Sequence, residues 1–245
     1  MKTIFDDNEN IIETSKLLFL SNKGQECVVY KYYNEVIKIF KKDYKLQHIT
    51  KENIEYLENI KTKRILMPTG YIKDEKEKLI GYKMKYINGS KDINNENTYD
   101  VINALEALRD DVEILSNKKV ILLDINANNM IFNGKLYLID PGNYMVGKDK
   151  SYNKVRQWNY DKINKLIDEL LFSKKFNLYQ LRLIVQFFNK ERENNHTNYN
   201  LDIIKKYFEP SLKIKDGISK FVRYNIKDDP KEKEFFEKIM EDFNR

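Results

Sequence analysis

A hairpin signal near the middle of the chain constrains the fold more than any other feature of the sequence. Two short apolar segments, 130–132 and 136–139, flank an Asn-Gly pair, and an Asn-Gly pair in that setting is the strongest short-range signal for a β-hairpin. Asn129 comes directly before the first segment and Asp140 directly after the second. Because a hairpin brings the outer ends of its two strands together, we expect these side chains to meet at one edge.

A third oxygen-bearing side chain, Asp124, lies in the loop before the hairpin. Hard cations such as magnesium bind clusters of carboxylate and amide oxygens and bridge them to phosphates. The sequence therefore predicts a cation site at this edge of the hairpin.

The order of these residues resembles two motifs of protein kinases. Asp124-x-x-x-x-Asn129 is similar to the catalytic loop, and Asp140-Pro141-Gly142 to the metal-binding Asp-Phe-Gly. The resemblance implies that Asp124 orients a substrate hydroxyl and accepts its proton, and that Asn129 and Asp140 hold magnesium ions. Asp-Pro-Gly alone is most often a turn, but both motifs in this order across a predicted hairpin favour function.

The N-terminal part contains a second resemblance. Residues 22–30, NKGQECVVY, are similar to the glycine-rich loop G-x-G-x-x-G-x-V, with Gly24 at its middle glycine and Val29 at its valine. Asn22 and Cys27 replace the outer glycines, which lets fewer backbone amides approach a phosphate closely.

Lys38, at the end of the sequence Val-Ile-Lys, resembles the strand lysine that pairs with the α- and β-phosphates and with a helix glutamate. Standing alone, it would be a solvent-facing lysine of an edge strand. Three glutamates of the helix predicted at 50–61 are candidate partners, and spacing alone does not choose among Glu52, Glu55 and Glu58. We favour Glu55.

Residues 81–89, GYKMKYING, look like the fifth strand and hinge of a kinase. The resemblance implies that Met84 lies at the back of an adenine pocket and that Val29 and Ile131 sandwich the ring. The backbone expected to bond the adenine edge belongs to Lys85, Tyr86 and Ile87. An ordinary strand with alternating exposure explains the same pattern without a ligand.

The predicted elements place a β-rich part before a helical part. Strands at 17–20, 27–32 and 35–40 form an antiparallel meander, and strands at 69–73 and 79–87 follow the helix at 50–61. Further helices are predicted from apolar repeats at 101–115, 160–171, 178–188, 201–208, 218–223 and 235–243.

The expected fold class is α+β, a bilobed protein-kinase-like fold. The N-lobe, residues 1–88, has a small antiparallel β-sheet with one helix, and the larger C-lobe, residues 89–245, is mainly helical. Together they would form one domain.

Several residues depart from the kinase pattern. Leu122 and Leu123 replace the His-Arg before the catalytic Asp, so regulation through a phosphorylated activation segment is not expected. Asn126 stands where kinases carry a lysine that steadies the γ-phosphate. Asp161 either resembles the aspartate that braces the catalytic loop or is an acidic residue favoured near a helix N-terminus.

Composition excludes several classes of protein. The formal charge of +6 comes from 44 basic and 38 acidic residues dispersed along the chain, which gives little reason to expect nucleic-acid binding. The single cysteine excludes an intrachain disulfide and suits a reducing compartment. With no apolar run long enough for a leader or a membrane segment, we expect a cytoplasmic protein. Export without a cleavable leader would leave no trace in the sequence.

The resemblance implies a compact, divergent bacterial-type kinase that uses ATP and Mg2+ to phosphorylate a Ser or Thr hydroxyl of a protein. Three alternatives remain. A small-molecule kinase of the aminoglycoside or choline type would usually have a His where Leu123 stands. A pseudokinase acting as a nucleotide-binding scaffold or switch fits the imperfect glycine loop and Asn126. A basic nucleic-acid-binding protein would need clustered charge.

Overall fold

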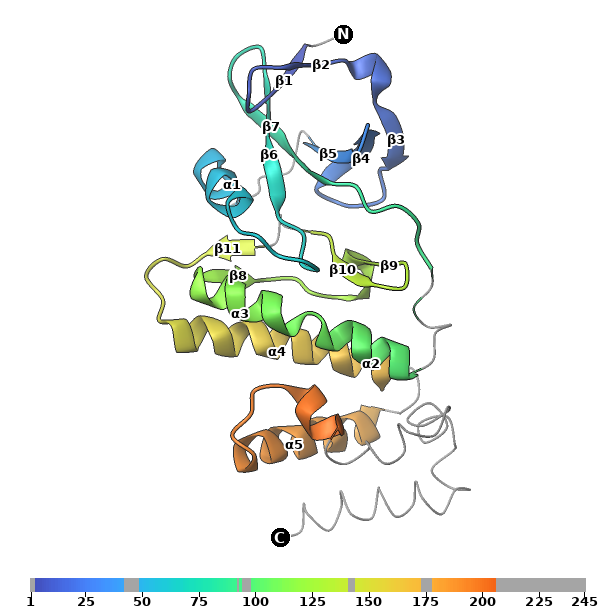
Figure 1. Cartoon of the computed structure of the whole chain (residues 1–245), viewed down its shortest axis with the longest axis vertical. Coiled ribbons are helices and arrows are strands. Elements are labelled where there is room, and N and C mark those ends of the chain that lie inside the picture. Colours follow the sequence, from blue (N-terminus) through green and yellow to red (C-terminus); the bar gives the residue numbers. More distant parts are fainter. Residues whose placement is uncertain are drawn as a thin grey trace.

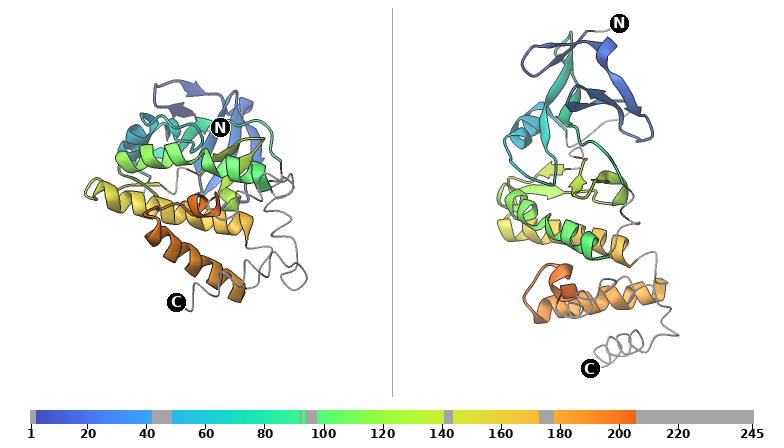
Figure 2. Two further views of the ribbon diagram at one scale, coloured as in Figure 1. Left: turned by 60° about the horizontal axis from the view of Figure 1, so that its bottom comes forward. Right: turned by 45° about the vertical axis from the view of Figure 1, so that its right-hand side comes forward.

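The computed structural model describes residues 3–41, 49–91, 93, 98–140, 144–172 and 178–205. Its architecture is α+β, with a curled antiparallel sheet at one end of the molecule and the longer helices at the other (Figure 1). The two further views of Figure 2 keep this separation. The structure is therefore compatible with the expected two-lobed arrangement, whereas the boundary at residues 88 and 89 stays a prediction.

The sheet has the order β2-β1-β6-β7-β5-β4-β3, and every neighbouring pair is antiparallel. Its strands are β1 (Ile4–Asp6), β2 (Ile11–Ile12), β3 (Leu18–Ser21), β4 (Cys27–Tyr32), β5 (Glu35–Phe40), β6 (Pro68–Asp74) and β7 (Leu79–Lys85). The predicted meander of three strands is confirmed as β3-β4-β5, and the strands predicted after the helix are β6 and β7. A short 3-10 helix, η1 (Thr14–Lys16), precedes β3.

Each face of the sheet is covered by a different element. On one face, Ile54 of α1 (Lys51–Glu58) belongs to the same buried apolar cluster as Tyr71, Tyr82 and Met84. The opposite face carries a small cluster of isoleucines, Ile4, Ile12, Ile37 and Ile72, in which the N-terminal hairpin β1-β2 takes part. Burial of this apolar surface stabilises two strands that are too short to be recognised from their sequence.

The helix predicted at 50–61 is confirmed with narrower bounds. Thr50 caps it, because the Thr50 side chain accepts a hydrogen bond from the Asn53 backbone N–H at 3.2 Å. Ile54 and Leu57, three residues apart, are its buried positions, so the helix presents one apolar stripe to the rest of the protein.

The other end of the molecule consists of helices around short strands. They are α2 (Thr98–Glu106), α3 (Arg109–Asn117), β8 (Val120–Leu122), η3 (Ala127–Asn129), β9 (Met130–Phe132), β10 (Leu136–Leu138), β11 (Tyr144–Val146), α4 (Tyr152–Leu171) and α5 (Leu178–Asn194). The apolar repeat at 101–115 is divided between α2 and α3. Residues 200–205 are helical, and the helices predicted at 218–223 and 235–243 lie outside the described residues.

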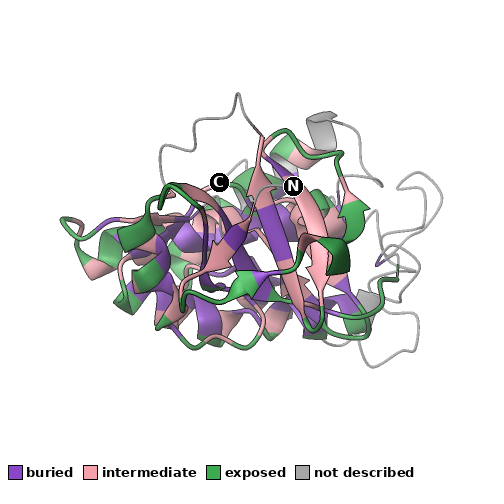
Figure 3. Cartoon of the chain, turned by 90° about the horizontal axis from the view of Figure 1, so that it is seen from above, coloured by how far each residue is buried: buried purple, intermediate pink, exposed green. Residues whose placement is uncertain are grey.

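The segment between α1 and β6 contacts the helical part through hydrogen bonds and a β-bridge. Asp111 of α3 is fully buried, and its carboxylate accepts hydrogen bonds from the backbone N–H groups of Lys63, Arg64 and Ile65. Ile65 also forms a parallel bridge with Leu138 of β10. A view from the sheet end shows buried positions gathered toward the middle and exposed ones mainly on turns and outer faces (Figure 3).

None of the helices in the described part of the chain combines the length and the apolar character that crossing a membrane requires.

Candidate functional site

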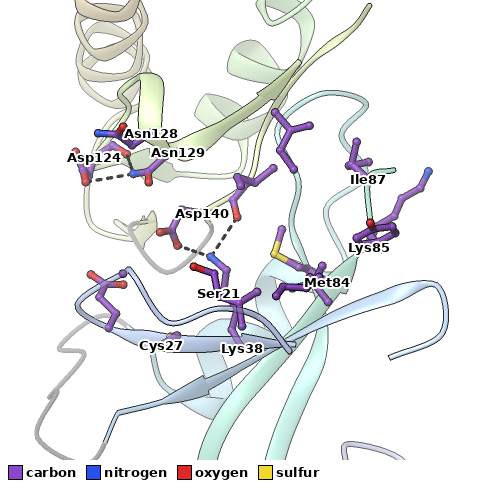
Figure 4. Close-up of a pocket in the computed structure, with 18 of the residues that line it drawn as sticks. Ser21, Cys27, Lys38, Met84, Lys85, Ile87, Asp124, Asn128, Asn129 and Asp140 are labelled. Atoms are coloured by element: carbon purple, nitrogen blue, oxygen red, sulfur yellow. Dashed lines mark hydrogen bonds and ion pairs between the residues drawn. The ribbon is translucent and has the colours of Figure 1, made fainter. Parts of the chain in front are cut away.

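A cavity of about 720 Å³ opens between the sheet and the hairpin β9-β10 (Figure 4). Every predicted site residue except Glu55 lines it. The complete lining consists of Leu20, Ser21, Gly24, Gln25, Glu26, Cys27, Val29, Val36, Lys38, Met84, Lys85, Tyr86, Ile87, Asp124, Asn126, Asn128, Asn129, Ile131, Ile139 and Asp140.

Lys38 and Asp140 form an ion pair across this cavity. The Lys38 Nζ lies 3.1 Å from the Asp140 Oδ1 and donates also to the Ile139 carbonyl oxygen at 3.3 Å. Lys38 is only 9% exposed, so the pair is shielded from much of the screening that weakens surface ion pairs. Two residues 102 positions apart in the chain are thus brought together by the fold.

The hairpin explains how Asn129 and Asp140 reach the same cavity. β9 and β10 pair with Met130 opposite Leu138, and the Ile139 N–H donates to the Asn129 carbonyl oxygen at 3.0 Å. Gly134 has φ +90°, a conformation that side-chain-bearing residues rarely adopt, which accounts for glycine in the turn. The predicted hairpin is confirmed.

The Asp124 carboxylate is held by two side-chain amides. The Asn126 Nδ2 donates to its Oδ1 at 2.9 Å, and the Asn129 Nδ2 donates to its Oδ2 at 3.2 Å. Figure 4 shows Asp124 and Asn129 side by side. Donors on both oxygens fix the rotation of the carboxylate. Asn126, noted in the sequence only as a missing lysine, is one of these two donors.

The donor set fits magnesium only in combination with phosphate. The Asn129 amide nitrogen is bonded to Asp124, which leaves the amide oxygen as the end that can face a cation. Mg2+ is usually bound by one or two carboxylates together with substrate phosphates, and Asp140 and Asn129 supply a carboxylate and an amide oxygen. Within the described ranges no group of three His, Cys, Asp or Glu side chains could hold a metal, and a site of this kind requires none.

The loop before β4 is anchored by Lys41, whose Nζ donates to the carbonyl oxygens of Gly24 at 2.6 Å and Asn22 at 3.1 Å. A Cβ built on Gly24 would meet no atom within 4 Å, so the fold itself does not require glycine there. Cys27 begins β4 and is 6% exposed; burial raises the pKa of its thiol to about 12. The thiol is therefore protonated and unsuited to nucleophilic chemistry.

The segment after Met84 lines the cavity, but one of its backbone N–H groups is already hydrogen-bonded elsewhere. Met84 is 2% exposed and lines the cavity from β7. The Tyr86 N–H donates to the Asn34 carbonyl oxygen at 3.0 Å, so this donor is already used within the sheet. Of the expected adenine-binding backbone, the Tyr86 amide is therefore committed elsewhere.

Glu55 is not the partner of Lys38, which corrects the preference drawn from the sequence. Glu55 is exposed on α1 and, among the described residues, forms no ion pair with Lys38. Because Ile54 and Leu57 face the protein interior, Glu55 falls on the outer side of the helix. Glu52 is also exposed, and Glu58 lies near Asp7 and Lys83, where burial raises its pKa.

Asn159, and not Asp161, braces the loop before Asp124. Its Oδ1 accepts from the Leu122 N–H at 2.9 Å, and its Nδ2 donates to the Val120 carbonyl oxygen and to the Ser116 Oγ. Asp161 lies in the middle of α4 and accepts from the Gln157 side chain. Both roles considered for Asp161 are therefore wrong.

Tyr82 is the site residue that sequence reasoning missed. It is 1% exposed, and its hydroxyl donates to the Asp140 Oδ1 at 3.4 Å. Its ring centroid lies 5.5 Å from the Lys38 Nζ. The available signal was the period of two in β7, which puts Tyr82 on the same face as Met84.

No protein-family model matches this chain, and a search of the curated proteins finds no significant match.

Proposed function

We propose that this protein is an ATP- and magnesium-dependent phosphotransferase with a bilobed, protein-kinase-like fold, and that its acceptor is a Ser or Thr hydroxyl of a protein. The observation that carries the proposal is the convergence of Lys38, Asp124, Asn129 and Asp140 on one cavity of about 720 Å³. Each of these residue types has a separate task in phosphoryl transfer.

The nucleotide is proposed to lie with its adenine between Val29 and Ile131 and its edge toward the backbone of residues 85–87. Met84 closes the inner end of this apolar section. Lys38, at the other end, neutralises charge on the phosphates. The ion pair that Lys38 makes with Asp140 at 3.1 Å supports this assignment, because it puts the cation beside the proposed metal ligand.

Asp124 is proposed to orient the acceptor hydroxyl and to accept its proton. The amide donors on both of its oxygens, at 2.9 and 3.2 Å, support this role, because a base acts efficiently only when it is held in position before the reaction. The Asn126 amide is neutral and bonded to Asp124, so it does not supply the positive charge that a lysine would bring to the γ-phosphate.

Asn129 and Asp140 would hold Mg2+, which when bound neutralises the charge that develops on the transferred phosphoryl group. The task left to the protein is mainly positioning, and the buried brace of Asn159 on Leu122 at 2.9 Å contributes to it.

The proposal is tested by thermal-shift titration with ATP in the presence and absence of Mg2+. A ligand that binds only the native state at 100 times its Kd raises stability by about 2.7 kcal/mol, so the wild type should show a Mg2+-dependent rise in Tm. Asp140→Ala should abolish the Mg2+-dependent part. Asp149→Ala, which removes an exposed carboxylate outside the cavity, is the matched control. An equal response of wild type and Asp140→Ala would refute the proposal.

A pseudokinase is the second candidate, favoured by the neutral Asn126 in place of a lysine. The two candidates predict different behaviour for one variant, Asp124→Ala. An active enzyme loses phosphate transfer in this variant and still binds nucleotide, whereas a scaffold has no transfer to lose. Offering labelled ATP with protein and with small-molecule acceptors separates the protein kinase from a kinase of the aminoglycoside or choline type.

A further inference from the structure

Tyr82 occupies a central position behind the ion pair of Lys38 and Asp140. It lies on β7 directly opposite Lys38 of β5. Its ring packs in an apolar cluster with Tyr71, Met84 and α1, and the side chain is 1% exposed. A hydroxyl buried at this depth needs a hydrogen-bond partner, and it finds one in the Asp140 Oδ1 at 3.4 Å.

Two donors therefore converge on one oxygen of Asp140. The Lys38 Nζ reaches the same Oδ1 at 3.1 Å, and the Tyr82 ring centroid lies 5.5 Å from that Nζ, within the range of a cation–π contact. The phenol thus touches both members of the pair, the lysine through its ring and the carboxylate through its hydroxyl.

Among the described residues, no glutamate of α1 forms an ion pair with Lys38. Glu52 and Glu55 are exposed, and Glu58 lies near Lys83. Within the described ranges Lys38 has one carboxylate partner, Asp140. If phosphates attract the lysine, the Tyr82 hydroxyl is the second donor that stays on the same carboxylate oxygen.

We propose that Tyr82 is a positioning residue of the nucleotide site, which orients the Asp140 carboxylate for Mg2+ and supports Lys38 in place of a helix glutamate. This inference rests on the proposed function. A neutral phenol suits the role because it donates to the carboxylate without competing with the cation for charge.

The test is Tyr82→Phe, which keeps the ring and removes the hydroxyl. Binding of ATP is measured by thermal shift and by displacement of a fluorescent ATP analogue, first in EDTA and then across a Mg2+ titration. ATP affinity in EDTA should stay within about twofold of wild type, whereas the Mg2+ concentration for half-maximal binding should rise about 3- to 10-fold. This rise is smaller than the full loss of a hydrogen bond to a carboxylate would give, because the bond is long, at 3.4 Å, and orients the ligand without touching the cation. In a transfer assay the apparent KM for Mg2+ rises and kcat changes less.

Tyr71→Phe is the matched control, because Tyr71 belongs to the same apolar cluster and is also buried. It should titrate with Mg2+ as the wild type does. Tyr82→Met, which fills the volume without a hydroxyl, replaces Tyr82→Phe if the latter does not melt cooperatively.

The outcomes distinguish a failure of the proposed function from a failure of the role assigned to Tyr82. If the wild type shows no Mg2+-dependent nucleotide binding, the proposed function fails and this inference fails with it. If the wild type binds Mg2+ with nucleotide but Tyr82→Phe follows the same Mg2+ titration, the inference alone is overturned. An equal loss of affinity in EDTA and in Mg2+ would also overturn it, since that result describes a loosened cavity and not a misoriented carboxylate.

Discussion

The hydrogen bonds between Asp111 and the segment after α1 should be among the most stabilising polar contacts in the protein. The carboxylate is fully buried and accepts from three consecutive backbone N–H groups, those of Lys63, Arg64 and Ile65. Asp111→Asn preserves the shape of the side chain, but it removes the charge and sets an amide N–H group where one acceptor oxygen was. At least one backbone N–H loses its acceptor.

The magnitude follows from the type of bond. A hydrogen bond to a charged acceptor contributes about 1.5–3 kcal/mol, and bonds that share one acceptor do not add independently. We therefore expect Asp111→Asn to lower the free energy of unfolding by about 2–4 kcal/mol, a large part of the 5–15 kcal/mol that is typical of native proteins. At an m value of about 3 kcal/mol/M, this lowers the urea midpoint by about 1 M.

The assay is urea unfolding followed by circular dichroism, with Asp110→Asn as the control. Asp110 is the exposed neighbour in the first turn of α3, so its loss removes only a helix-dipole interaction of about 0.3–1 kcal/mol. Equal midpoints for Asp111→Asn and Asp110→Asn would refute the reasoning.

Three further predictions concern single side chains. Asn159→Leu should destabilise the fold by about 2–3 kcal/mol, because its buried backbone and hydroxyl partners lose their hydrogen bonds. The control Asp161→Ala should change the urea midpoint little. Similar effects of the two variants would contradict the bracing role assigned to Asn159. Burial raises the pKa of Asp168 from 3.8 to about 7, so the folded state binds its proton more tightly and stability falls as pH rises between these values. In Asp168→Asn the plot of urea midpoint against pH should be flatter over this range. An unchanged slope would disprove the prediction. The Cys27 thiol, with its pKa raised to about 12, should react with Ellman's reagent at pH 8 much more slowly in the native protein than in urea; equal rates would contradict its burial.

Much of the sheet and the hairpin could be predicted because their signals are local. The Asn-Gly pair marks the turn between two adjacent strands, and the alternation in 27–32 and 35–40 requires no knowledge of distant residues. The cluster of Asp124, Asn129 and Asp140 near one edge was predictable for the same reason, since each residue flanks or precedes the same hairpin.

The parts that were missed depend on tertiary packing. The strands β1 and β2 are short, and only the apolar face that they help to cover makes them strands. Which glutamate of α1 faces Lys38 depends on how the helix is rotated, and the buried stripe of Ile54 and Leu57 turns Glu55 outward. The bond between Tyr82 and Asp140 spans 58 positions, and no local pattern encodes it.

The hairpin β9-β10 is hydrogen-bonded to two segments that flank strands of the sheet. The Leu66 N–H donates to the Leu138 carbonyl oxygen at 2.8 Å on β10, and the Lys91 N–H donates to the Phe132 carbonyl oxygen at 2.7 Å on β9. The Asn133 side chain adds a bond to the Asn88 carbonyl oxygen at 2.9 Å, so each strand of the hairpin is tied to a segment next to the sheet. Because Asn129 and Asp140 flank these strands, the position of both side chains relative to the sheet depends on these contacts.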